Sequence, residues 1–129
     1  MIRIEIAGRE IPLVWNMASW VTVEEEVCPF VEIKDVLFDK AKSGRGATKL
    51  TVELIRILGN EGLSLKGEEA DLTTDWLLKN IRPAKFHELT MRVIDAFAEG
   101  MEIKLNKKDP HAERDMVLEE VQEKKAGDT

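Results

Sequence analysis

Large apolar side chains occupy every second position near the start of the chain. They form two runs, Ile2, Ile4 and Ile6, then Ile11, Leu13 and Trp15. A period of two residues is typical of a strand with one buried face. Between the runs, Gly8 and Arg9 suit a two-residue turn, because glycine tolerates the positive φ that such a turn requires. We therefore predict a β-hairpin of residues 2–7 and 10–15, with Pro12, which has no N–H to donate, at an unpaired or edge position.

The spacing of apolar residues becomes helical after Asn16. Asparagine is a good N-cap, and apolar side chains then recur at helical spacing until Pro29, which predicts a helix over residues 17–27. A second, shorter helix is predicted at about residues 32–40, before a glycine-containing run at 43–46 that would break it. Its inward-facing residues are expected to be Ile33, Val36 and Leu37.

A leucine-rich stripe marks the middle of the chain. Its members are Leu50, Leu54, Ile55 and Leu58. They predict a third helix over residues 48–58, and Gly59 follows at the position that a helix C-cap prefers. Residues 60–65 are then predicted to form a loop with two apolar anchors.

Two further helices are predicted in the second half of the chain. The fourth is capped by Thr73 or Thr74 and ends before Pro83. Its apolar residues are Trp76, Leu77 and Leu78. Proline suits the first turn of a helix, so a fifth helix is predicted over residues 83–99, ending at Gly100. One face of this helix is expected to be the spine of the core, formed by Phe86, Leu89, Val93 and Phe97.

The density of large apolar residues falls beyond about residue 104. A short amphipathic helix there would rest on Met116, Val117, Leu118 and Val121. A lone helix of that length is marginally stable in water. We predict a globular domain of residues 1–106 and a charged, flexible or partly helical tail of residues 107–129. The expected fold class is mainly α: a small N-terminal β-hairpin followed by about five helices.

The composition fits one globular domain. The chain has 129 residues, of which 43% are hydrophobic, and its formal net charge is −6. That charge argues against nucleic-acid binding, since a sequence-independent grip on phosphates needs clustered Lys and Arg. Cys28 is the single cysteine, which excludes an intrachain disulfide and favours a cytoplasmic protein. The chain contains no signal-peptide pattern and no apolar run of membrane-spanning length, so we expect neither export nor membrane insertion.

The residues that could perform chemistry are few and scattered. His87 and His111 are the two histidines, on different predicted elements, and a metal site would need more ligands than these two offer. No histidine lies near Cys28 in the sequence, and its thiol is interpreted as a small buried hydrophobe rather than a nucleophile. The glycines match neither a dinucleotide-binding fingerprint nor a phosphate loop. We therefore expect no enzyme activity, no metal and no cofactor.

Three consecutive glutamates follow the tryptophans in the first predicted helix. Because each residue turns the helix by about 100°, its apolar side chains span one arc, and Glu24 falls inside that arc. The members of the arc are Trp20, Val27, Met17, Cys28 and Val21. Two interpretations of Glu24 stay open: a side chain that reaches solvent from a partly exposed helix, or a polar contact within an interaction surface. A catalytic acid is the third alternative, and no second carboxylate or base accompanies it.

The order of these motifs resembles that of a known protein family. Three stretches carry the likeness: EIPLVWNMASWVTVEEE at 10–26, LTVELIRILGNEG at 50–62 and LTTDWLLKNIRPAKFHELTMRVIDAFAEGM at 72–101. They resemble the tail assembly chaperones of long-tailed bacteriophages and Gram-positive prophages, in which a hairpin and an acidic-ended helix precede leucine-rich helices separated by glycine and proline. The likeness covers about residues 2–103 and contains no catalytic signature.

The resemblance implies a non-catalytic protein that binds the tape measure protein, together with tail tube subunits, before the phage tail is built in the host cytoplasm. Such chaperones are typically absent from the finished virion. The alternative is a structural or adaptor component of the tail or head–tail connector that stays in the particle. A small regulatory subunit or hydrolase is the enzyme-class alternative, for which the chain offers no pairing of nucleophile and base. Assembly as a homo-oligomer is left open.

Trp15, Met17, Trp20 and Glu24 are the residues that we expect to contact a protein client. Aromatic residues make up only 5% of the chain, yet two tryptophans lie beside the acidic run. A client-binding surface must be apolar without causing aggregation, and adjacent glutamates would keep it dispersed. The competing interpretation is that both tryptophans belong to the core.

Overall fold

The structure is a computed structural model that describes the backbone of residues 1–38 and 46–103 and the side chains of 1–35 and 46–103. The predicted tail of residues 107–129 lies outside this part of the chain, as does most of the predicted breaker run. Within the described residues, a two-stranded antiparallel sheet is followed by five α-helices and one short 3₁₀ turn, which confirms the predicted fold class. None of the described helices combines the length and apolar character that crossing a membrane requires.

The hairpin consists of β1 (Ile2–Ile6) and β2 (Arg9–Leu13). Its turn lies one residue earlier than predicted, at Ala7 and Gly8, whose φ values are 52° and 79°. A primed turn needs positive φ at both central positions, and glycine meets that need without strain at the second. Arg9 therefore begins the second strand instead of ending the turn.

One face of the hairpin belongs to the core. Its buried side chains are Ile4, Ile6, Ile11 and Leu13. Because Ile6 and Arg9 close the two-residue turn as a hydrogen-bonded pair, alternate cross-strand pairs are bonded, and the pair of Arg3 with Pro12 is not. Pro12 thus occupies a position where its missing N–H costs no ladder bond, as its place in the sequence predicts.

The longest helix, α3 (Ala47–Leu65), continues through the residues that were expected to end it. The predictions of a C-cap at Gly59 and of a loop over residues 60–65 are wrong. Glycine is common at helix ends, but it is also used inside helices where another backbone approaches closely. Gly59 and Gly62 are glycines of this second kind, because both lie inside α3 and next to another segment.

Gly59 and Gly62 are the points at which α3 touches its neighbours. A Cβ atom on Gly59 would lie 2.9 Å from Cγ2 of Ile11 and 2.6 Å from Cδ1 of Leu72. One on Gly62 would overlap the carbonyl oxygen of Pro12. The absence of a side chain at both positions therefore lets the helix lie directly against β2.

The actual end of α3 is a Schellman motif around Gly67, whose φ of 81° lies in the left-handed region. The Glu68 N–H donates to the Leu63 carbonyl (2.9 Å), and the Gly67 N–H donates to the Ser64 carbonyl (3.1 Å). These two bonds satisfy carbonyls that the end of a helix would otherwise leave without a donor.

The two helices that follow the hairpin are α1 (Met17–Glu26) and α2 (Phe30–Phe38). α1 begins at the predicted residue, and α2 begins two residues earlier than predicted. Ile33 is fully buried, as its predicted inward position requires. Val36 and Leu37 were also predicted to face inward, but their side chains are outside the described part.

The second half of the fold contains α4 (Thr74–Asn80) and α5 (Phe86–Gly100). Of the two predicted caps, Thr73 is the N-cap, and its hydroxyl accepts a hydrogen bond from the Trp76 N–H (3.1 Å). The predicted fifth helix is confirmed, except that its first residues form the 3₁₀ turn η1 (Pro83–Lys85). On its predicted core face, the buried residues are Leu89, Val93 and Phe97, and Phe86 is half-buried.

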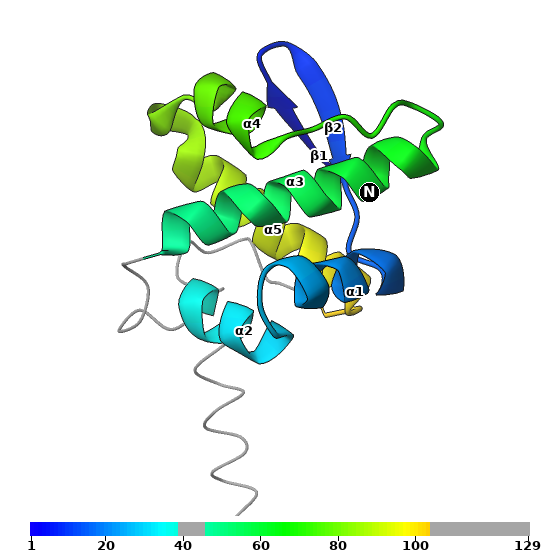
Figure 1. Ribbon diagram of the computed structural model, residues 1–129, viewed down its shortest axis with the longest axis vertical. Coiled ribbons are helices and arrows are strands. Elements are labelled where there is room, and N and C mark those ends of the chain that lie inside the picture. Colours follow the sequence, from blue (N-terminus) through cyan, green and yellow to red (C-terminus); the bar gives the residue numbers. More distant parts are fainter. Residues whose placement is uncertain (39–45, 104–129) are drawn as a thin grey trace, which may run out of the picture.

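α3 is the central helix of the fold (Figure 1). It packs against β2 and against α1, α4 and α5, while α5 also packs against β1. The core therefore lies between the buried face of the hairpin and the faces of α3 and α5. α1 and α2 lie at the opposite end of the molecule from the hairpin turn (Figure 1), and each exposes apolar side chains.

Candidate protein-binding surface on α1 and α2

A capping box at the N-terminus of α1 fixes which side of the helix faces the core. Asn16 Oδ1 accepts a hydrogen bond from the Ser19 N–H (3.0 Å), and Ser19 Oγ accepts one from the Asn16 N–H (2.9 Å). The Ser19 hydroxyl also donates to the Val14 carbonyl (3.0 Å), and Asn16 Nδ2 donates to Glu61 on α3 (2.9 Å). These bonds place Ser19 on the inner side of the helix, where it is 2% exposed.

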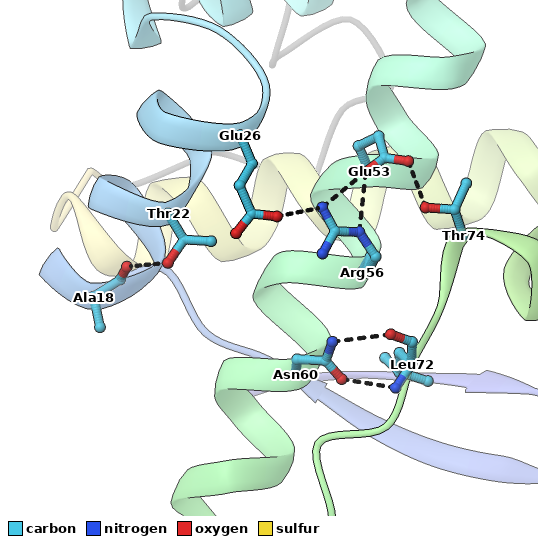
Figure 2. A network of polar contacts seen from close by, with 8 residues as sticks. All are labelled: Ala18, Thr22, Glu26, Glu53, Arg56, Asn60, Leu72 and Thr74. Atoms are coloured by element: carbon cyan, nitrogen blue, oxygen red, sulfur yellow. Dashed lines mark hydrogen bonds and ion pairs between the residues drawn. The ribbon is translucent and has the colours of Figure 1, made fainter.

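The C-terminus of α1 is tied to α3 and α4 by a polar network, which Figure 2 shows. Arg56 donates from Nη2 to Glu26 Oε1 (3.1 Å) and from Nε to Glu53 Oε2 (3.0 Å), and Thr74 donates to Glu53 Oε1 (2.6 Å). Burial raises the pKa of Glu53, but the hydrogen bonds from Thr74 and Arg56 and the charges of Arg56 and Lys49 outweigh it, so this pKa lies below its ordinary value.

Beneath α1 and α2 lies a cluster of four aromatic rings. Trp15 is central, with ring-centroid distances of 5.4 Å to Trp20, 5.5 Å to Phe30 and 4.5 Å to Phe97 of α5. Gly100 makes room for Trp15, because a Cβ atom there would overlap the tryptophan's carbonyl oxygen. Trp15 is only 4% exposed, so it belongs to the core.

The outer side of α1 exposes two large apolar side chains to solvent. With Ser19 and Val23 buried on the inner side, Met17 is 66% exposed and Val21 is 46% exposed. Glu24, two turns after Met17, is exposed on the same side and forms no ion pair within the described residues. Of the alternatives for Glu24, a side chain that reaches solvent is therefore the one the geometry favours.

α2 also exposes apolar area, and it meets α1 through the rings of Phe30 and Trp20. Val31 is 70% exposed, and the half-buried ring of Phe30 lies 5.0 Å from that of Trp20. Glu24, Glu25 and Glu32 are exposed acidic residues on the same two helices. We call Met17, Trp20, Val21, Phe30 and Val31 the α1–α2 surface.

The four residues predicted to contact a client have different positions. Met17 and Glu24 are exposed, Trp20 is half-buried and Trp15 is buried. Trp15 therefore supports the α1–α2 surface from beneath and offers no area of its own. Phe30 and Val31 were not among the predicted contact residues. Their position as an apolar pair directly after the helix-breaking Pro29 was a signal for including them.

Reactive groups are not assembled around this surface. Cys28 is half-buried between α1 and α2, and burial, followed by the nearby charge of Glu32, raises the pKa of its thiol. Within residues 1–38 and 46–103, no group of three or more His, Cys, Asp and Glu side chains is arranged to hold a metal ion. The features that stand out on α1 and α2 are thus apolar area and surrounding negative charge.

Comparison with known proteins found no matching family model, no matching curated protein and no matching solved structure. The geometry of the α1–α2 surface and the motif order of the sequence must therefore carry the functional argument.

Proposed function

We propose that this protein is a non-catalytic tail assembly chaperone of a long-tailed phage. It binds the tape measure protein, and tail tube subunits as well, in the host cytoplasm while the tail is built. The observation that carries the proposal is the α1–α2 surface, where Met17, Val21 and Val31 are 66%, 46% and 70% exposed. The order of hairpin, acidic-ended helix and leucine-rich helices, which resembles that family, supports the same function.

The shape and chemistry of the α1–α2 surface suit a helical client. Trp20 and Val21 follow Met17 by three and four positions, so the three side chains lie on one side of α1. An apolar helix face can cover them. Trp20 and Phe30 are held by the ring cluster below, so little side-chain freedom is lost when a client binds. Half-buried aromatic rings of this kind often contribute most of the binding energy at an interface.

The flanking glutamates have a separate role in this proposal. Exposed apolar area promotes self-association, and a ring of like charges opposes it. Glu24, Glu25 and Glu32 would keep free copies apart until a client with a complementary face arrives. The acidic run that follows the two tryptophans thus has a role in keeping the free protein dispersed.

Co-expression with the tape measure protein of the same phage tests the proposal. The tagged chain should capture the tape measure protein from the lysate and keep it from precipitating. A tape measure protein that precipitates alike with and without the chain, and is not captured, would contradict the proposal. Mass spectrometry of purified virions adds a second criterion, because a stoichiometric amount of the chain in the particle would favour the retained structural component instead.

A further inference from the structure

A groove follows β1 at the end of the molecule that is remote from the α1–α2 surface. Its volume is about 880 Å³, and its walls are residues 3–8 on one side and α4, η1 and the first half of α5 on the other. Figure 1 shows the hairpin and α4 next to each other at this end. β2 contributes no residue to the described lining. We call this feature the β1 groove.

The backbone edge of β1 that faces away from β2 is open. Since Ile6 and Arg9 form a hydrogen-bonded pair, the N–H and C=O groups of Arg3 and Glu5 point away from β2. Within the described residues, no backbone hydrogen bond from another segment reaches these groups. An open strand edge is a template for one more strand.

The outer edge of β2 is covered at its C-terminal end, around Pro12 and Val14. The Val14 N–H donates to the Leu58 carbonyl of α3 (3.1 Å), Pro12 has no N–H, and the Pro12 carbonyl lies against Gly62. α3 therefore covers part of the β2 edge, whereas β1 is the strand that lines the groove.

Positive side chains dominate the lining of the β1 groove. They are Arg3, Lys79, Arg82, Lys85 and Arg92. The acidic residues of the lining are Glu5 and Glu88, so the groove carries a formal excess of positive charge, whereas the whole chain has a net charge of −6. Four of the five cations pair with carboxylates of the chain, mostly at exposed positions where such pairs are weak. Arg82 is exposed and forms no ion pair within the described residues.

We propose that the β1 groove binds an extended, acidic peptide segment of a partner protein as a third strand of the sheet. The partner's backbone bonds to the open groups of Arg3 and Glu5, and its carboxylates face Arg82 and the other cations of the lining. The site is separate from the α1–α2 surface, and the proposal does not depend on the identity of any client bound there.

A peptide fits this edge better than a nucleic acid does. A strand edge presents alternating N–H donors and C=O acceptors, which a peptide backbone matches with its own acceptors and donors. A phosphate backbone offers acceptors only, and the net charge of −6 opposes a long polyanion outside the groove. Nucleic-acid binding is therefore an outcome that the test must distinguish.

The test uses fluorescence anisotropy with the full chain and a fluorescein-labelled peptide of four Glu-Val repeats. This peptide has a strand-forming alternation and one charged face. We expect saturable binding below about 1 mM peptide, weakened by salt. The same Glu-Val peptide with every backbone amide N-methylated keeps the charge but has no N–H to donate to a ladder, and it should not compete. A Lys-Val peptide keeps the ladder but reverses the charge, and it should not compete either.

Two charge-reversal variants locate the site. Arg82→Glu should weaken binding of the Glu-Val peptide by at least about tenfold, because it replaces an unpaired cation of the lining by an anion. Lys66→Glu makes the same charge change at an exposed position outside the groove and should alter binding by less than about twofold. Both variants should match the parent in thermal unfolding, since neither side chain is buried.

Amide hydrogen exchange supplies the direct readout of strand addition. Binding should protect the amides of Arg3 and Glu5, whereas those of Ile4 and Ile6 are already protected by β2. The proposal is overturned by absence of binding, by equal competition from the N-methylated peptide, or by unchanged binding in Arg82→Glu. It is also overturned if a single-stranded oligonucleotide binds more tightly than the peptide, or if the Arg3 and Glu5 amides are protected only by self-association of the chain.

Discussion

α3 and α1 both carry several large apolar residues, but they use them in opposite ways. α3 is 19 residues long and buries residues on most of its circumference. These are Leu50, Thr51, Val52, Leu54, Ile55, Ile57, Leu58, Gly59, Gly62 and Leu63. α1 buries only Ser19 and Val23, while Met17 and Val21 face solvent. The apolar content of a helix therefore does not tell whether that helix is core or surface.

The difference follows from what surrounds each helix. α3 contacts the hairpin and the helices α1, α4 and α5, so nearly every apolar side chain on it finds a neighbour within the chain. Among the described elements α1 packs mainly against α3 and α2, and the buried hydroxyl of Ser19 fixes which side of α1 faces the core. The apolar residues on its open side add little to stability, which is the property expected of a binding surface.

Removing the largest ring below the surface should have the greatest effect on stability. Trp15→Ala deletes a side chain that contacts Trp20, Phe30 and Phe97, and we expect the free energy of unfolding to fall by about 3–5 kcal/mol. Urea denaturation measures this change. Val31→Ala, at a 70% exposed position, is the control and should cost less than about 0.5 kcal/mol. Equal losses of unfolding free energy in the two variants would contradict the assignment of Trp15 to the core and of Val31 to the surface.

The contact between α3 and the hairpin can be broken by one methyl group. In an ordinary helix interior, Gly→Ala stabilises by about 1 kcal/mol. Gly62→Ala should instead destabilise by about 2–3 kcal/mol, because the new Cβ meets the Pro12 carbonyl and β2 must move. Ser64→Ala on the exposed side of the same helix should stay within about 0.5 kcal/mol of the parent. A stabilised Gly62→Ala variant would show that the helix and hairpin do not touch.

The network that fixes the C-terminus of α1 should respond to pH. The pKa of Glu53 in the folded protein is below its ordinary value of 4.5, so its contribution is present above the unfolded pKa and is lost as the pH falls through the folded pKa. Glu53→Gln should therefore lower stability at neutral pH by about 1 kcal/mol and approach the parent at low pH. Glu24→Gln, at an exposed position, is the control and should change the free energy of unfolding at neutral pH by less than about 0.5 kcal/mol. A constant difference between Glu53→Gln and the parent would contradict the pKa assignment.

Local signals in the sequence predicted most of the elements but not their contacts. Asn16 and Thr73 have capping side chains that act on neighbouring residues, so the starts of α1 and α4 could be predicted. Gly59 and Gly62 could not be interpreted correctly, because their role depends on Ile11, Leu72 and Pro12, which are distant in sequence.

The candidate surface was predictable only in part for a similar reason. Met17 and Glu24 could be selected from spacing within one helix, and both are exposed. The burial of Trp15 depends on Phe97 and Gly100 near the C-terminal end of α5. The contribution of Phe30 and Val31 depends on how α2 lies beside α1. Spacing within a helix does not report such contacts between helices.

We propose that the exposed residues of the α1–α2 surface, Met17, Val21 and Val31, bind a client while adding little to the stability of the fold. The most direct test uses the double variant Met17→Ser, Val21→Ser. Its dissociation constant for the tape measure protein is measured and compared with that of the parent. Its matched control is Leu65→Ser combined with Leu78→Ser, which removes two apolar side chains, each 60% exposed, from α3 and α4. We predict that the first pair weakens binding by at least about tenfold and the control by less than about twofold, while both change unfolding by under about 0.5 kcal/mol. Equal dissociation constants for the two double variants would contradict the account.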